Sequence, residues 1–309
     1  MKRMLPLLVA LILLLPGCSR RGYDLSARRI QADTEYLCEQ IGDRPTGTDK
    51  ERAAAHWLEG QLEEAGFSRQ DGSLLRVPFQ GLFDLTSENV IAVCNPSSEG
   101  PILCVMAHYD TVAGSPGARD NSSSVAVLLE LARYLGPERT GLTGQVRLLF
   151  LGSEENGYHG ASAYVEGLSQ EERQRHLAIF NMENSAASPG PGAILTCATL
   201  GGVVDGAYQE GNFLEPMPNL ASQALSQASQ ALGGDPLPLF HRGMSDHVVF
   251  HEAGLEAANI SWRFLDSDGL ITVPPEYHLP SDTPDTMDFR GGVTTGSCIL
   301  WAVEELLGE

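Results

Sequence analysis

Several apolar runs in this chain end in a histidine or in acidic residues, and this feature restricts the possible folds most. Residues 102–107, 146–151 and 178–182 are such runs, and they lead into His108-Tyr109-Asp110, Glu154-Glu155 and Glu183. In open α/β sheets, the residues that bind ligands lie just beyond the carboxyl ends of the strands. The runs therefore predict a sheet with one edge that gathers a histidine and several carboxylates.

Strand-like and helix-like segments alternate along the chain. Short apolar runs predict strands at 74–79, 89–94, 101–107, 146–151, 178–182 and 193–197. Apolar residues at helical spacing predict helices at 28–41, 49–66, 123–135, 157–168, 218–232 and 291–307. This alternation favours an α/β fold, a three-layer αβα sandwich with a mixed, mainly parallel central sheet.

The composition narrows the possible partners. The 309-residue chain carries a formal net charge of −20, and 42% of its residues are hydrophobic. Such an acidic chain is an unsuitable partner for nucleic acid, because binding to phosphates needs a basic face. An acidic excess is typical of a solvated, soluble surface. The hydrophobic share is sufficient for a substantial core, and we expect residues 28–309 to form a single domain.

Residues 1–17 have the features of a secretory signal peptide. A basic start precedes an apolar stretch, residues 5–15, that is too short to span a bilayer. The stretch ends in Leu15-Pro16-Gly17-Cys18, which resembles a bacterial lipoprotein box and predicts a lipid on Cys18, with residues 18–27 as a tether. This interpretation makes the protein an exported lipoprotein, anchored to the membrane and facing the periplasm or the cell surface. The alternative is an ordinary signal peptide that is cleaved nearby.

The cysteines leave two possibilities open. Five cysteines remain besides Cys18, so at least one thiol is free or pairs outside the chain. Cys94 and Cys104 flank a turn-like segment, residues 95–101. If the flanking strands formed a hairpin, the two thiols could face each other and form a disulfide, which persists in an oxidising compartment. Otherwise both cysteines are small buried hydrophobic residues.

The residues at the predicted strand ends are the donors that zinc prefers, namely histidine nitrogen and carboxylate oxygen. Two zinc ions held close together share one bridging carboxylate. Asp120 suits that bridge because it lies between a loop, residues 117–119, and the start of a predicted helix. With Asp120 shared, one metal position would take His108 and Glu183, and the other would take Glu155 and His278.

Two further acidic residues belong to the predicted centre without binding metal. Glu154 is needed at neither position, so it is free to take a proton from water held between the metals. Asp110 is close enough to His108 to orient the imidazole through its other ring nitrogen. His159, His176, His241 and His251 have no partner pattern and are assigned to the core or the surface.

The order of these residues resembles the di-zinc exopeptidase family of bacterial leucyl aminopeptidases and yeast aminopeptidase Y. Glutamate carboxypeptidase and glutaminyl cyclase are more distant members of that family. The resemblance covers most of the chain and rests on Arg44-Pro45-Thr46-Gly47-Thr48, His108-Tyr109-Asp110, Asp120-Asn121-Ser122-Ser123, Glu154-Glu155, Asn181-Met182-Glu183, Ser245-Asp246-His247 and Tyr277-His278-Leu279-Pro280-Ser281-Asp282-Thr283. It implies the zinc exopeptidase fold and two zinc ions per chain.

The resemblance also implies a role for each matching residue. The implied metal ligands are His108, Asp120, Glu155, Glu183 and His278, and the implied general base is Glu154. Tyr277 would stabilise the oxyanion, and Asp110, Asp246 and His247 would lie behind the ligands. The family further implies a cis peptide bond between Asp120 and Asn121.

Three positions could distinguish the site of this chain from the sites of its relatives. Glu183 stands where the family usually has Asp, and its longer side chain must shift either the metal or the backbone. Arg119 stands where small or polar residues are commoner, and it could touch a substrate carboxylate at the mouth of the site. Arg242 lies in a stretch, residues 242–246, that resembles a substrate-contacting segment of the relatives.

The resemblance implies an aminopeptidase, in which water activated by two zinc ions attacks the first peptide bond of a substrate with a free amino terminus. One alternative is a glutaminyl cyclase, which uses one zinc ion and no activated water; another is a carboxypeptidase or dipeptidase. A non-catalytic binding protein on the same scaffold is disfavoured, because every ligand position holds a competent residue type. The expected partner is a peptide substrate, with membrane contact only through a lipid on Cys18.

Overall fold

The computed structural model describes residues 22–186, 193–195, 202–204, 207–209, 218–240, 245–262, 264–265, 271–272 and 274–309. The predicted signal peptide and Cys18 lie outside these residues, as do Cys197 and Arg242. Within the described ranges, every helix is too short or too polar to cross a bilayer.

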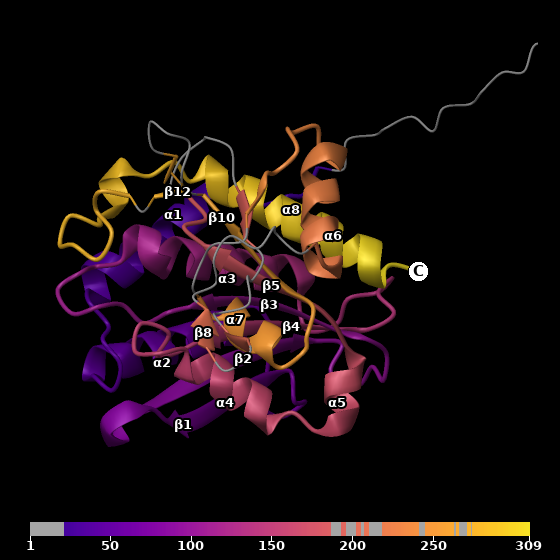
Figure 1. The fold of residues 1–309 in the computed structure, drawn as a ribbon, viewed down its shortest axis with the longest axis horizontal. Helices are drawn as coiled ribbons and strands as arrows, with labels where there is room; N and C mark the ends of the chain where they lie inside the picture. The colour runs from indigo at the N-terminus through magenta and orange to yellow at the C-terminus, as the bar shows by residue number, and fades with distance from the viewer. Residues whose placement is uncertain are drawn as a thin grey trace, which may run out of the picture.

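Eight of the described strands form one sheet, in the order β1-β2-β4-β3-β5-β10-β6-β9. Figure 1 labels β1 to β5 and β10 of this sheet. These strands are β1 (Leu74–Gln80), β2 (Thr86–Cys94), β3 (Ile102–His108), β4 (Gln145–Leu151), β5 (His176–Glu183), β6 (Ala193–Leu195), β9 (Leu239–Phe240) and β10 (Ala257–Ser261). The four central strands, β4, β3, β5 and β10, run parallel to one another. The flanking pairs β1–β2, β2–β4 and β10–β6 are antiparallel, so the sheet is mixed, as predicted. The short hairpins β7 (Gly202–Val204) with β8 (Ala207–Gln209), and β11 (Phe264–Leu265) with β12 (Ile271–Thr272), lie outside it.

Helices cover both faces of the sheet and give the three predicted layers (Figure 1). One face is covered by α1 (Ala27–Glu35), α2 (Asp49–Glu64), α3 (Ser123–Leu135), α6 (Leu220–Ala231) and α8 (Arg290–Leu307). The other face is covered by α4 (His159–Gly167) and α7 (His247–Glu252). The shorter elements are α5 (Gln170–Arg175) and the turns η1 (Tyr36–Ile41), η2 (Leu82–Asp84), η3 (Ala118–Ser122) and η4 (Pro284–Thr286).

The centre of the sheet is buried and well packed where it supports the predicted site. All residues of β3 are buried, as expected for a continuous apolar run covered on both faces. Helix α3 packs on β3 and has the bounds that the sequence predicts, residues 123–135. Helix α2 begins at Asp49 because the side chain of Thr48 accepts a hydrogen bond from the Glu51 N–H.

The structure decides between the two alternatives left open for Cys94 and Cys104. Strand β4 lies between β2 and β3, so these two strands do not form a hairpin. Cys94 and Cys104 are therefore buried in separate hydrophobic clusters, on opposite faces of the sheet, and both are free thiols. The alternative, that each is a small buried hydrophobic residue, is confirmed.

The parallel strands β3, β4 and β5 end at the same edge of the sheet. His108 is the last residue of β3, Glu183 is the last residue of β5, and Glu154-Glu155 follow the end of β4. The turn η3, which contains Asp120, leads into α3 at this edge. The predicted convergence of ligand residues thus follows from strands that run in the same direction.

His176, at the start of β5, is a buried core histidine away from that edge. Its Nδ1 lies 2.6 Å from the carbonyl oxygen of Glu172, and its Nε2 lies 3.0 Å from the hydroxyl of Tyr164. Nδ1 therefore carries the proton and Nε2 accepts one. Burial lowers the pKa of His176 to about 4, from a usual value near 6.5.

This histidine is expected to make the protein less stable in acid. Between pH 6.5 and 4 the unfolded chain binds a proton at His176 that the folded chain excludes, so the free energy of unfolding falls as the pH falls. The slope is at most about 1.4 kcal/mol per pH unit. We expect His176→Gln to lose this contribution, as measured by denaturant unfolding of both proteins from pH 7 to 4. Parallel stability profiles for the two proteins would contradict the assignment.

Candidate metal centre

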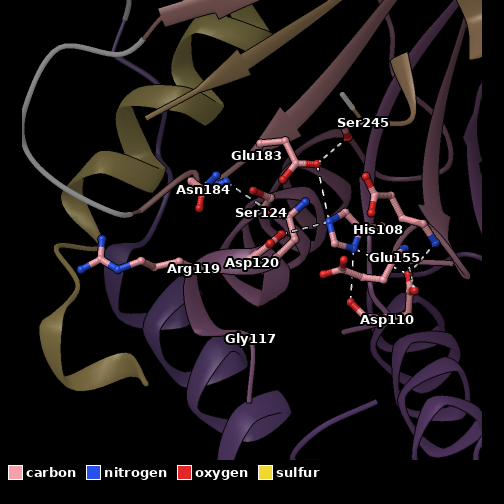
Figure 2. A network of polar contacts seen from close by, with 12 residues as sticks. His108, Asp110, Gly117, Arg119, Asp120, Ser124, Glu155, Glu183, Asn184 and Ser245 are labelled. Atoms are coloured by element: carbon pink, nitrogen blue, oxygen red, sulfur yellow. Dashed lines mark hydrogen bonds and ion pairs between the residues drawn. The ribbon is translucent and has the colours of Figure 1, made fainter. Parts of the chain in front are cut away.

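The five predicted ligands converge at the carboxyl edge of the sheet, and Asp120 lies between the two histidines. His108 Nε2 is 3.2 Å from Asp120 Oδ1, and His278 Nε2 is 3.3 Å from Asp120 Oδ2. Figure 2 shows the side chains of His108, Asp120 and Glu183 pointing toward one another. Each oxygen of Asp120 thus faces a different histidine, which is the arrangement that a bridging carboxylate needs.

Two groups of candidate ligands share Asp120. In the first, His108 Nε2 lies 3.5 Å from Glu183 Oε1. In the second, His278 Nε2 lies 3.1 Å from Glu155 Oε2. Within each group the candidate ligand atoms lie within 4.8 Å of one another, a spacing at which each group could hold a metal ion. The pairing of residues is the one that the sequence predicts.

Glu154 lies beside both groups. It forms a further cluster with His108 and Glu155, and its side chain is buried. The carboxylate of Asp110 sets the position of this segment, because Oδ1 accepts the N–H of Glu154 at 2.9 Å and Oδ2 accepts the N–H of Glu155 at 3.1 Å.

Asp110 also contacts His108, though differently from the sequence-based expectation. His108 Nδ1 lies 3.2 Å from the backbone oxygen of Asp110 and 3.6 Å from its carboxylate. The backbone oxygen is therefore the nearer acceptor for the imidazole, and the carboxylate mainly holds the Glu154-Glu155 backbone.

The peptide bond between Asp120 and Asn121 is cis, as the family resemblance implies. The side chain of Asn121 ties this turn to the end of β5: its Nδ2 donates to the Met182 oxygen at 2.9 Å, and its Oδ1 accepts the Asn184 N–H at 3.2 Å. The turn that carries Asp120 and the strand that carries Glu183 are therefore joined directly.

Glu183 is held by a hydroxyl group whose role the sequence reasoning missed. Ser245 Oγ donates to Glu183 Oε1 at 2.7 Å, and Asn181 Nδ2 donates to Ser245 Oγ at 2.9 Å (Figure 2). Ser245 stands next to Asp246 and His247, so its place in that segment was the available signal. The hydroxyl directs the longer side chain of Glu183 toward His108.

Asp246 and His247 lie behind the ligand groups. Both side chains are fully buried at the start of α7. Burial raises the pKa of Asp246 well above its usual range, although the charge of His108 opposes the shift. Neither residue belongs to the ligand groups found among the described residues. Tyr277 is half-buried and stacks on His278, with ring centroids 3.7 Å apart.

Arg119 does not lie at the mouth of the site. Its side chain is only 5% exposed, and Nη2 donates to the hydroxyl of Thr286 at 3.1 Å. Figure 2 shows it pointing away from Asp120 and His108. The expected contact with a substrate carboxylate therefore loses its basis, because the guanidinium is directed into the protein.

Carboxylates crowd the centre, and burial together with neighbouring negative charge raises the pKa values of Glu154 and Glu155. Burial raises the pKa of Glu154 well above its usual range, against the charge of His108 and with the charges of Asp246 and Glu183. Burial and the charge of Asp120 raise the pKa of Glu155 to about 8. Burial lowers the pKa of His108, but the charges of Glu154 and Glu183 outweigh burial and hold it well above its usual value. These directions mean that ionised carboxylates are disfavoured in the buried centre, and a bound cation would relieve that repulsion and favour their ionised form.

The donors of the two groups suit zinc. Each group offers one imidazole nitrogen together with carboxylate oxygens, whereas calcium and magnesium take oxygen ligands. Glu155 Oε1 is buried and has no hydrogen-bond partner among the described residues. Since buried polar atoms are almost always satisfied, this oxygen is free to bind a metal ion.

Comparisons with known sequences agree with this chemistry. A family model described as "Peptidase family M28" matches residues 89–302. "Aminopeptidase YwaD" of Bacillus subtilis is 32% identical over 248 residues, which are 78% of this chain and 50% of that protein. "Probable lipoprotein aminopeptidase LpqL" of Mycobacterium tuberculosis is 37% identical over 106 residues, which are 34% of this chain and 21% of that protein. The chain thus spans half or less of the length of these relatives.

Solved structures show the same fold. The zinc aminopeptidase BSAP from Bacillus subtilis matches with a TM-score of 0.75 and 21% identity, over 94% of this chain and 97% of that one. A glutaminyl cyclase from Porphyromonas gingivalis matches with a TM-score of 0.71 and 21% identity, over 92% of this chain and 99% of that one. The fold therefore does not distinguish the two activities, and the residues of the site must.

Proposed function

Because the chain belongs to peptidase family M28, we propose that it is a zinc-dependent aminopeptidase that removes N-terminal residues from peptides. The single observation that carries this proposal is the position of Asp120, whose two oxygens face two separate ligand groups. A bridging carboxylate between two such groups is characteristic of two-metal hydrolysis. The names of the curated relatives, both aminopeptidases, support the same activity.

In this proposal His108, Glu183 and Asp120 hold one zinc ion, and Glu155, His278 and Asp120 hold the other. Zinc held by these residues would supply a Lewis acid that lowers the pKa of water and polarises the carbonyl of the scissile bond. Glu154 takes a proton from the attacking water and passes it to the leaving nitrogen. Asp110 keeps Glu154 in place through the backbone contact described above.

Tyr277 and the acidic surroundings complete the proposed mechanism. Burial and the charges of Asp120 and Glu155 raise the pKa of Tyr277 above its ordinary value, so its hydroxyl stays protonated. It can then donate a hydrogen bond to the carbonyl oxygen as negative charge develops there. The surrounding carboxylates favour binding of a substrate whose scissile bond lies next to a positively charged amino group. A peptide with a free amino terminus, the substrate of an aminopeptidase, has this arrangement.

The proposed location rests on the sequence and on one relative. We keep the proposal of a signal peptide at residues 1–17, a lipid on Cys18 and a single peptidase domain from residue 28 to 309. The word "lipoprotein" in the name of the mycobacterial relative supports this anchor. Mass spectrometry of the mature N-terminus tests the proposal: a lipid-modified Cys18 is expected, and an unmodified terminus would overturn it.

A substrate panel tests the activity directly. We expect the zinc-loaded protein to hydrolyse aminoacyl-p-nitroanilides and C-terminally amidated peptides, but not N-acetylated peptides. Hydrolysis of N-acetylated peptides instead would indicate a carboxypeptidase, and cyclisation of N-terminal glutaminyl peptides without hydrolysis would indicate a glutaminyl cyclase. No turnover of any of these substrates by a protein that binds two zinc ions would contradict the proposed function.

A further inference from the structure

The loop that carries Asp120, residues 117–122, contains little regular secondary structure. Several of its contacts are with distant parts of the chain. Gly117, before η3, has a φ of +66°, and a Cβ there would lie 2.4 Å from the Asp120 oxygen. The backbone of η3 departs from helical geometry at Asp120 and Asn121, so contacts with other segments help to hold it. Besides the Asn121 contacts described above, two buried charged side chains, Arg44 and Asp282, contact this loop.

Arg44 joins this loop to the segment that carries His108. The side chain is fully buried, and Nε donates to the backbone oxygen of Tyr109 at 2.7 Å. Its two terminal nitrogens donate to the Pro116 oxygen at 3.1 Å and to Ser122 Oγ at 2.7 Å, on either side of Asp120. Arg44 thus fixes the separation between His108 and Asp120.

Arg44 forms further hydrogen bonds through its guanidinium and its backbone. Nη1 also donates to the Leu37 oxygen at 3.1 Å and the Gly42 oxygen at 2.7 Å. The backbone of Arg44 pairs with Thr111, since the Arg44 N–H donates to Thr111 Oγ1 at 2.8 Å and the Thr111 N–H donates to the Arg44 oxygen at 3.2 Å. All the described acceptors of the Arg44 side chain are uncharged. Within the described residues, the guanidinium therefore links separate loops through hydrogen bonds and not through an ion pair.

Asp282 joins the same loop to the segment that carries His278. Its carboxylate accepts two backbone N–H groups, from Arg119 at 2.9 Å and from Asp120 at 3.2 Å. Its backbone oxygen accepts the Ala118 N–H at 3.2 Å. Asp282 is fully buried and follows His278 in one tight turn, in which its own N–H donates to the Leu279 oxygen at 3.0 Å.

We propose that Arg44 and Asp282 are positioning residues, and that each of them orients the ligands of a different metal position. Arg44 sets the geometry of the position formed by His108, Asp120 and Glu183. Asp282 sets that of the position formed by Asp120, Glu155 and His278. The inference rests on the proposed two-metal centre. Residues that orient metal ligands typically change metal affinity about 10–100-fold when they are replaced.

The two conservative replacements should therefore weaken different metal positions. Arg44→Lys keeps the positive charge but loses the planar fork that reaches several acceptors at once. Asp282→Asn keeps the shape but replaces one of the two accepting oxygens by an NH2 group, which cannot accept the N–H that faces it. We expect Arg44→Lys to weaken zinc at the His108–Glu183 position about 10–100-fold, and Asp282→Asn to weaken zinc at the Glu155–His278 position by a similar factor.

The chain offers a matched control pair. Arg133 and Asp33 form an ion pair between α3 and α1, with Nη1 and Oδ2 2.5 Å apart, and both side chains are largely buried. Neither residue contacts a candidate ligand through the contacts described. Arg133→Lys and Asp33→Asn repeat the same two substitutions at a distance from the centre, and they should leave both zinc affinities unchanged.

The experiment measures zinc at each position during stepwise removal by a chelator, from anomalous scattering in crystals of each variant. Solution zinc titrations supply the affinities, and circular dichroism of the metal-free proteins reports the fold. The expected result is that Asp282→Asn loses the Glu155–His278 ion first, whereas Arg44→Lys loses the His108–Glu183 ion first and at lower chelator than the wild type. If Arg44→Lys does not fold, Ser122→Ala removes one acceptor of the fork and should give a smaller loss at the same position.

The outcomes separate this inference from the proposed function. Wild-type affinities at both positions in Arg44→Lys and Asp282→Asn would overturn the inference alone, as would equal losses at both positions in both variants. A wild-type protein that binds no zinc would overturn the metal centre and the inference together.

Discussion

Glu154→Gln is expected to lower kcat by about 10²–10⁴-fold while the protein keeps its fold and its zinc. The amide has nearly the shape of the carboxylate but cannot accept the proton of the attacking water. Glu154 is the acidic residue of the centre that neither ligand group of the proposed pair requires. Its loss should therefore remove the base without opening either metal position.

The measurement compares kcat on an aminoacyl-p-nitroanilide with the zinc content of the same preparation. Glu155→Gln is the matched control, because it makes the same change at the adjacent residue but removes a proposed ligand. We expect that control to lose zinc from the His278 position as well as activity. Near-normal kcat in Glu154→Gln would exclude Glu154 as the base.

Glu183→Ala is expected to give a folded protein with about one zinc ion and little peptidase activity. The change leaves the first position with His108 and the shared Asp120, which are too few donors for a four-coordinate site. The second position keeps Asp120, Glu155 and His278, so one ion should remain. Zinc analysis after gel filtration, with circular dichroism of the same sample, measures both parts of this expectation.

The wild-type protein should show the same asymmetry in milder form. The candidate donors Glu183 and His108 are 3.5 Å apart, compared with 3.1 Å for Glu155 and His278, and the longer arm of Glu183 depends on Ser245 for its direction. We expect the His108–Glu183 ion to be the first lost to a chelator, and Ser245→Ala to make that loss easier. Loss of the Glu155–His278 ion first in the wild type would contradict this order.

The strand ends could be predicted from the sequence because they depend on local patterns. Continuous apolar runs such as residues 102–107 are visible in the chain, and the direction of parallel strands then brings His108 and Glu183 to one edge. The order of strands in the sheet depends on contacts between distant segments. The position of β4 between β2 and β3 could not be inferred locally, so the sequence could not decide whether Cys94 and Cys104 face each other across a hairpin.

The contacts that hold the site residues in place could not be predicted from the sequence either. Arg44 belongs to a segment that resembles the family, but its sequence position does not show that its guanidinium reaches Tyr109, Pro116 and Ser122. Arg119, which stands where small or polar residues are commoner in the family, was expected at the mouth of the site, and instead it is buried against Thr286. Such contacts join residues far apart in the chain, so only the folded structure identifies them.

The most direct test of the two-metal centre is the position of zinc in crystals grown at saturating zinc, located by anomalous scattering. The account predicts two peaks about 3.5–4 Å apart, one on each side of the Asp120 carboxylate. A single peak, or peaks that do not contact Asp120, would contradict it.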